Sequence, residues 1–220
     1  MEAGALHSAA VEAENAGSAP WRTLGPDEGV FIAYHWLDER GNAIVWDGDR
    51  TPLERTVEPG DALSQAMHVR GPIPPGRYRL ALDLVVEQRF WLAELGNEPL
   101  EQDVDVAPRD ASGARTFFAD GLEPTPGWAD RARALHEEGY AAVGGAVDVE
   151  RGLLRRTPAE LEPYAPGGGR HPGFPHPLVC PSLLPPLAPN DEVAGLPAYR
   201  PDGDEPWMFD ARLVVTLRRR

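Results

Sequence analysis

Hydrophobic and polar residues alternate along much of the first half of the chain. In residues 78–86, every second residue is large and apolar, whereas Arg77, Arg79 and Asp83 occupy the opposite phase. A period of two is typical of a β-strand with one face on a core and the other toward solvent. The turn residues PPG at 74–76 directly precede this segment and favour a strand start there.

Similar segments recur between turn residues throughout this half. They cover residues 9–15, 30–37, 43–46, 63–69, 90–92 and 100–106. The sequence DERGN at 38–42 separates two of them and predicts a β-hairpin. No helical period interrupts the series. We therefore expect about seven strands in residues 8–108, arranged as an immunoglobulin-like antiparallel β-sandwich.

A different pattern begins after a predicted linker at residues 109–124. Thr125 can cap the first amides of a helix, Pro126 suits its first position, and Gly139 is placed to end it. Apolar residues at spacings of four and three predict its buried face: Trp128, Ala132 and Leu135. Residues 140–149 then read as a strand broken at the glycine pair 144–145.

Proline dominates the rest of the second half. Residues 158–206 contain 13 prolines, too many for a regular helix or an interior strand. We expect extended coil here, anchored by apolar residues: Leu178, Val179, Leu183, Leu184 and Leu187. Residues 208–217 alternate as a final strand, with one apolar face: Phe209, Ala211, Leu213, Val215 and Leu217. Residues 125–220 should thus form a Pro-rich, mostly irregular α+β unit with one short helix and a final strand.

Charge and composition narrow the range of partners. The net charge of −14 makes binding to nucleic acids and anionic membranes unfavourable, so neither is expected as a partner. No apolar run approaches the ~20 residues of a membrane-spanning helix, and the acidic N-terminus lacks the pattern of a secretory signal. The single cysteine excludes an internal disulfide. A cytoplasmic protein is the simplest interpretation.

An ordered series of short motifs resembles a known type of bacterial domain. The motifs lie at residues 15–21, 34–38, 47–51, 57–60, 75–78, 83–87 and 90–91. Over residues 8–108 they are similar to Ig-like accessory domains appended to glycosyltransferases and methyltransferases of surface-polysaccharide biosynthesis. They also resemble the carbohydrate-binding C-terminal domain of O-antigen ABC transporter ATPases. The resemblance implies a non-catalytic module of envelope-polysaccharide biosynthesis that binds a glycan or docks a glycosyltransferase.

Two alternatives remain open. Residues 128–147 resemble a helix-then-strand element of family-2-type glycosyltransferases, and Asp202 and Asp204 have the acid spacing of a metal-binding motif. The chain could then be a transferase fragment. An apolar face on residues 208–217 would instead suit a structural scaffold or a homo-oligomer.

Tryptophans are the best candidate ligand contacts, because indole faces stack on the apolar patches of sugar rings. Trp36 lies mid-strand, where Ig-like sandwiches bury a core tryptophan. Trp46 and Trp91 lie at strand ends. Together with Asp47 and Arg50, they form the predicted glycan-binding set.

Other motifs favour structural roles. His171, His176 and Cys180 match no zinc spacing, and no helix aligns them. The glycine run at 167–170 does not lie between a strand and a helix, as a phosphate-binding loop would. Acidic residues at 101–105 suit the solvated face of an edge strand. We therefore predict no catalytic residue, no metal and no cofactor.

Overall fold

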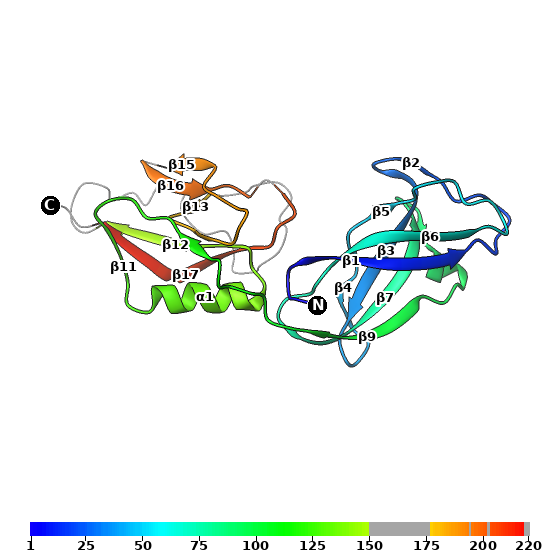
Figure 1. Cartoon of the computed structure of the whole chain (residues 1–220), viewed down its shortest axis with the longest axis horizontal. Helices are drawn as coiled ribbons and strands as arrows, with labels where there is room; N and C mark the ends of the chain where they lie inside the picture. The colour runs from blue at the N-terminus through cyan, green and yellow to red at the C-terminus, as the bar shows by residue number, and fades with distance from the viewer. Residues whose placement is uncertain (150–176, 194, 202, 218–220) are drawn as a thin grey trace. The chain divides into compact units, whose positions relative to one another are not determined.

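The computed structural model describes residues 1–149, 177–193, 195–201 and 203–217. About 49% of the chain lies in strands, and the described residues contain a single α-helix, so the protein is mainly β as predicted. The chain divides into two compact units, Met1–Ala107 and Pro108–Arg220 (Figure 1). No helix in the described part of the chain is long and apolar enough to cross a membrane.

The first unit is built from nine strands and a short 3₁₀ helix, η1 (Leu92–Leu95). The strands are β1 (Leu6–Glu14), β2 (Thr23–Gly25), β3 (Glu28–Leu37), β4 (Ala43–Val45), β5 (Thr51–Pro52), β6 (Ala62–Arg70), β7 (Gly76–Val86), β8 (Phe90–Trp91) and β9 (Leu100–Val106). All pairings between them are antiparallel. The pair β1–β6 forms one sheet, and β3 and β7 are the central strands of a seven-stranded sheet.

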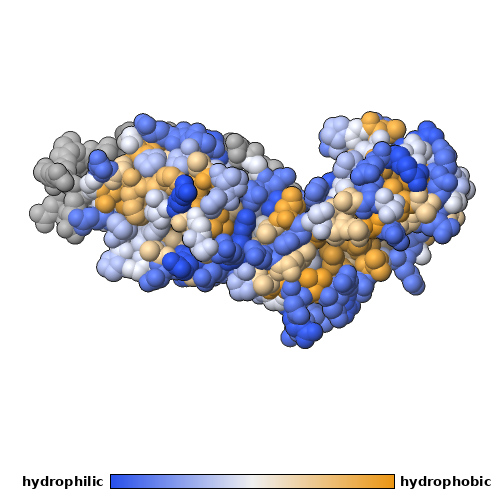
Figure 2. All heavy atoms as spheres, in the orientation of Figure 1, coloured by the Kyte–Doolittle hydropathy of each residue, from blue (hydrophilic) through white to orange (hydrophobic). Residues whose placement is uncertain are grey.

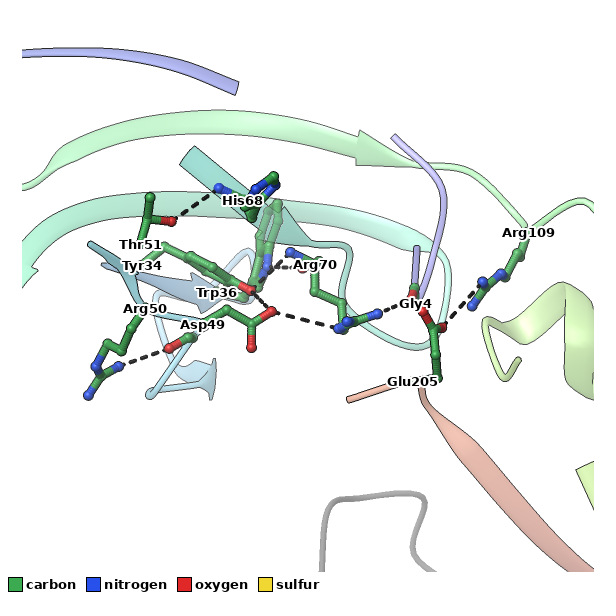
Figure 3. A network of polar contacts seen from close by, with 11 residues as sticks. Gly4, Tyr34, Trp36, Asp49, Arg50, Thr51, His68, Arg70, Arg109 and Glu205 are labelled. Atoms are coloured by element: carbon green, nitrogen blue, oxygen red, sulfur yellow. Dashed lines mark hydrogen bonds and ion pairs between the residues drawn. The ribbon is translucent and has the colours of Figure 1, made fainter. Parts of the chain in front are cut away.

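One core joins these two sheets. It gathers inward-facing residues from β1, β3, β6 and β7, among them Val11, Ile32, Tyr34, Trp36, Leu63, Met67, Val69 and Leu80. Trp36 is fully buried, as predicted, and its indole Nε1 donates to the carbonyl of Arg70 at 2.8 Å (Figure 3). Tyr34 Oη accepts the Arg70 backbone N–H at 2.9 Å. The two rings therefore tie strand β3 to the end of β6.

The predicted hairpin at residues 38–42 is confirmed. Trp36 of β3 pairs with Val45 of β4, so the chain reverses between them. The Asp38 carboxylate accepts the backbone N–H groups of Arg40 (2.9 Å) and Asn42 (2.8 Å). Hydrogen bonds from the Asn42 side chain and backbone lower the pKa of this exposed carboxyl. An aspartate that bonds its own turn in this way explains why the sequence reverses here.

The second unit contains helix α1 (Trp128–Glu138) and eight described strands. These are β10 (Arg115–Thr116), β11 (Leu122–Pro124), β12 (Ala142–Val149), β13 (Leu178–Val179), β14 (Ser182–Leu183), β15 (Asp191–Val193), β16 (Leu196–Tyr199) and β17 (Trp207–Leu217). One sheet has the order β10-β14-β12-β17-β11, with β12 and β17 parallel, and a second has the order β13-β16-β15. Helix α1 lies against β12 and β17.

Several expectations for this unit need correction. Residues 109–124 were predicted as a linker but supply β10 and β11 to the larger sheet. Strand β12 continues through the glycine pair, but its pairing with β17 is interrupted there, as a break at these glycines predicts. Side chains would not fit at this point: a Cβ on Gly145 would lie 1.8 Å from the Leu213 carbonyl oxygen. The alternation of residues 208–217 is also interrupted, since the β12–β17 register shifts between Gly144 and Ala146.

Helix α1 has Gly139 as its C-cap and buries its predicted apolar face. Its N-cap, however, is Gly127 and not Thr125. Gly127 adopts a left-handed φ of 79°, so the helix can begin only after it, and no side chain caps the first turn. Thr125 instead accepts the Trp128 N–H through its backbone carbonyl at 3.1 Å.

The described part of the Pro-rich segment is more regular than expected. Strand β16 contains Pro197 yet is the middle strand of its sheet. The Pro197 carbonyl accepts the Cys180 N–H at 2.8 Å, so the proline removes only a donor from the ladder and still serves as an acceptor. Proline count alone therefore underestimated strand content here.

Apolar side chains are not confined to the interior of the units. Figure 2 shows apolar patches among hydrophilic side chains on the face drawn. The exposed large apolar residues are Leu6, Leu24, Ile44, Trp46, Leu95 and Leu100. Trp46 is the aromatic residue of this set.

Candidate functional site

An aromatic cluster lies on the outer face of the seven-stranded sheet. Alternation along β3 places His35 on the face opposite Tyr34 and Trp36. The Trp46 ring stacks on His35, with centroids 4.1 Å apart and an interplanar angle of 22°. Trp91 contacts the same imidazole at 4.2 Å and lies 6.2 Å from Trp46. One aromatic cluster thus joins His35 of β3, Trp46 after β4 and Trp91 of β8.

The three rings differ sharply in exposure. His35 is 4% exposed and Trp91 is 8% exposed, whereas Trp46 is 56% exposed. His35 Nδ1 also hydrogen-bonds the Trp46 carbonyl oxygen, which fixes the backbone that carries the indole. Trp46 is therefore an exposed ring on a buried aromatic support.

Arg50 completes the cluster. Its guanidinium carbon lies 5.0 Å from the Trp91 ring centroid, a cation–π distance. Arg50 Nε donates to Glu87 at 2.8 Å, and Nη1 lies 2.6 Å from an Asp47 carboxylate oxygen. Two carboxylates and an indole face thus hold this side chain in one position.

A close backbone approach brings residues 46–50 to the site. Gly48 donates its N–H to the Tyr34 carbonyl at 3.0 Å. A Cβ on Gly48 would lie 2.5 Å from the Tyr34 ring, so only glycine lets the chain pass this close to β3. Trp46, Asp47 and Arg50 are consequently presented along the edge of the sheet.

A buried carboxylate lies on the same face of the sheet. Asp83 on β7 is 8% exposed and accepts the N–H groups of Leu84 at 2.7 Å and Ala93 at 3.2 Å. Burial raises the pKa of Asp83, whereas these two bonds and nearby His35 act in the opposite direction. The segment after β8 covers this carboxylate because Ala93 belongs to η1.

The structure brings all four predicted residues together. Trp46, Asp47, Arg50 and Trp91 lie within one connected set of contacts. Sequence reasoning missed His35, Glu87 and Asp83. His35 had a usable signal, because a strand whose Tyr34 and Trp36 face inward must turn the residue between them outward.

The acidic residues of β9 pair with arginines on β7. Arg77 lies 3.3 Å from Asp105, and Arg79 lies 3.2 Å from Glu101 and 3.5 Å from Asp103. Both arginines, with Asp103 and Asp105, line a groove of about 240 Å³. They fit the solvated strand face that the sequence predicts. No cluster of three or more metal-ligating side chains occurs among the residues that the structure describes.

Other sequence candidates lie elsewhere or outside the described residues. His171, His176, Asp202 and the glycine run at 167–170 fall outside them. Cys180 is fully buried, and burial raises the pKa of its thiol to about 11. A thiol that remains protonated and inaccessible does not serve as a nucleophile.

A histidine–serine pair in the second unit is structural. His136 of α1 is fully buried, with Nδ1 2.8 Å from the Tyr140 carbonyl and Nε2 2.9 Å from Ser182 Oγ. A neutral imidazole that donates through Nδ1 and accepts at Nε2 satisfies both contacts. Ser182 is 3% exposed, so a substrate does not reach this pair in the described conformation.

Comparison with known proteins adds no family to this description. No protein-family model matches the chain, and no curated protein or solved structure matches it significantly.

Proposed function

We propose that the first unit is an immunoglobulin-like carbohydrate-binding module of bacterial envelope-polysaccharide biosynthesis, without catalytic activity of its own. The observation that carries the proposal is the geometry of Trp46. Trp46 is 56% exposed although its ring stacks on the buried His35. A large apolar ring that is held rigidly in solvent loses little conformational freedom when a ligand covers it.

The strand pairing supports an immunoglobulin-like interpretation. With β1 as strand B, the pairs β1–β6 and β4–β3–β7–β9 follow the B–E and C′–C–F–G pairings of such domains. Trp36 occupies the place of the core tryptophan on strand C. Tyr78, near the start of strand F, donates its hydroxyl to the Pro74 carbonyl at 2.7 Å, which is the geometry of a tyrosine corner.

The chemistry of the cluster suits a sugar ring. The exposed part of the Trp46 indole can cover the apolar C–H patch of a pyranose, while polar groups at the rim bind hydroxyls. Asp47 directly follows Trp46 in the sequence, and 68% of its side chain is exposed. Its carboxylate can accept hydrogen bonds from sugar hydroxyls. Arg50 is partly exposed and can donate to a ring or hydroxyl oxygen.

A titration of the full chain with bacterial polysaccharides and their oligosaccharides, followed by calorimetry, tests the proposal. Wild type should bind at least one, and Trp46→Ala should reduce affinity about fivefold or more, since a stacking contact contributes about 1–3 kcal/mol. Leu24→Ala, another exposed apolar truncation in the same unit, is the matched control and should bind normally. Equal binding by wild type and Trp46→Ala would remove the basis of the proposal.

The assignment to envelope-polysaccharide biosynthesis, and docking to a glycosyltransferase as the alternative role of the module, rest on the motif resemblance of residues 8–108. A transferase partner would be captured from a bacterial lysate with the full chain as bait. Capture that survives Trp46→Ala would favour docking over glycan binding.

A further inference from the structure

We infer that the Trp46 site accepts uncharged or amino-bearing sugars and discriminates against uronic and phosphorylated sugars. This inference rests on the glycan-binding role proposed above and adds the chemical class of the ligand. It follows from how the charges around the aromatic cluster are paired.

The cation at the site is already neutralised. Arg50 is salt-bridged to both Glu87, at 2.8 Å, and Asp47, at 2.6 Å. Its Nη1 also donates to the Gly48 carbonyl at 2.8 Å, and its face is covered by Trp91. An acidic sugar would have to compete with two carboxylates for one guanidinium, so Arg50 offers it no net attraction.

Carboxylates contact Arg50 at the cluster. Asp47 is the more exposed carboxylate, with 68% of its side chain accessible, and Glu87 is 20% accessible. Glu94 of η1 is near enough to Asp83 to raise the pKa of that buried carboxyl electrostatically. Two carboxylates therefore lie against the arginine whose guanidinium covers the Trp91 ring. The chain as a whole, at −14, repels anions in addition.

The same arrangement favours an amine. A protonated amino group is attracted to an indole face and to a carboxylate, and Trp46 with the adjacent Asp47 offers both at the exposed rim. The aromatic ring supplies affinity for any pyranose with an apolar face. The surrounding carboxylates then favour neutral or cationic sugars over anionic ones.

Glycans grouped by charge test this inference on the full chain. Binding to an array of neutral, amino-bearing and acidic bacterial glycans is measured at low salt, and hits are repeated by calorimetry. Matched β-1,4-linked hexamers of N-acetylglucosamine, glucosamine and glucuronic acid are included. Neutral and amino glycans should bind about tenfold more tightly than acidic ones, and the gap should narrow in 1 M salt because screening shortens the range of the field.

Charge variants separate this effect from shape. Asp47→Asn should raise the ratio of acidic to neutral binding at least about fivefold. Asp105→Asn removes the same charge from the exposed edge strand outside the cluster, so it should leave that ratio unchanged. Acidic glycans that bind as well as neutral ones would overturn the charge inference and leave the binding role standing. Absence of binding in every class would overturn the binding role itself, and with it the inference.

Discussion

Substitution of Tyr34 by phenylalanine removes one buried hydroxyl and leaves the aromatic ring in place. Tyr34 is 2% exposed, and its Oη accepts the Arg70 N–H at 2.9 Å and lies 3.4 Å from Asp49 (Figure 3). Asp49 retains its ion pair with Arg70 at 3.7 Å after the substitution. The main loss is therefore the acceptor for one backbone N–H at the end of β6.

The size of the effect follows from burial. A buried donor left without a partner costs about 1–3 kcal/mol, because it can no longer bond water as it does in the unfolded chain. In a domain of about 100 residues, each kcal/mol lowers Tm by about 4–8 °C. We expect Tyr34→Phe to lower the Tm of the first unit by about 5–20 °C.

Scanning calorimetry of the full chain measures this shift, and hydrogen exchange at Arg70 locates it. The matched control is Tyr78→Phe, which also deletes one hydroxyl, but its bond to the Pro74 carbonyl is at an exposed position. Water can replace that partner, so the control should lose less stability. A Tyr34→Phe variant as stable as wild type, or less affected than the control, would refute the reasoning.

Three further predictions concern the second unit. Burial lowers the pKa of His136 below its usual 6.5, so the unfolded state binds a proton at a higher pH than the folded state. The urea concentration at the unfolding midpoint should therefore decrease as pH falls below about 6.5. A His136→Gln variant should lose this pH dependence. Asp210 is 8% exposed and ion-paired with Arg131 at 2.7 Å, so Asp210→Ala should cost about 2–4 kcal/mol by urea denaturation, and a cost under about 0.5 kcal/mol would contradict this. Cys180 should react with a thiol reagent only at the rate of unfolding, and prompt labelling of the native protein would contradict its burial.

Much of the first unit could be predicted because its longer strands carry local signals in the sequence. The period of two in residues 78–86 predicts the strand β7, although the opposite phase is buried as well at Ala81, Asp83 and Val85. The DERGN turn matches the connection between β3 and β4. Strands β2 and β5 were not predicted, because a strand of two or three residues is too short to show an alternating pattern. They exist through pairing with β3, which is a tertiary effect.

The second unit was harder to predict because its strands are short and depend on distant partners. Strands β10 and β14 contain two residues each and pair across a separation of more than 60 positions. Pro197 lies in a central strand because its carbonyl has a partner, a condition that composition does not reveal. Helix α1 was predicted well, since its apolar spacing and Gly139 are local signals.

The proximity of the candidate residues could be predicted in part, but the contacts that hold them together could not. Trp46, Asp47 and Arg50 are close in sequence, so their proximity was expected. The bond from Arg50 to Glu87 joins residues 37 positions apart, and no local pattern indicates it. The alternation on β7 placed Asp83 toward solvent, whereas η1 folds over that face and buries it.

Indole N–H resonances test the central claim most directly, because the chain has six tryptophans and each gives its own signal. The full chain is labelled with ¹⁵N, Trp46 and Trp36 are assigned from phenylalanine variants, and a polysaccharide that binds in the titration is added. We expect the Trp46 resonance to shift with ligand concentration while that of buried Trp36 stays in place. A ligand that binds without moving Trp46 would contradict the proposal that this ring is the glycan-binding surface.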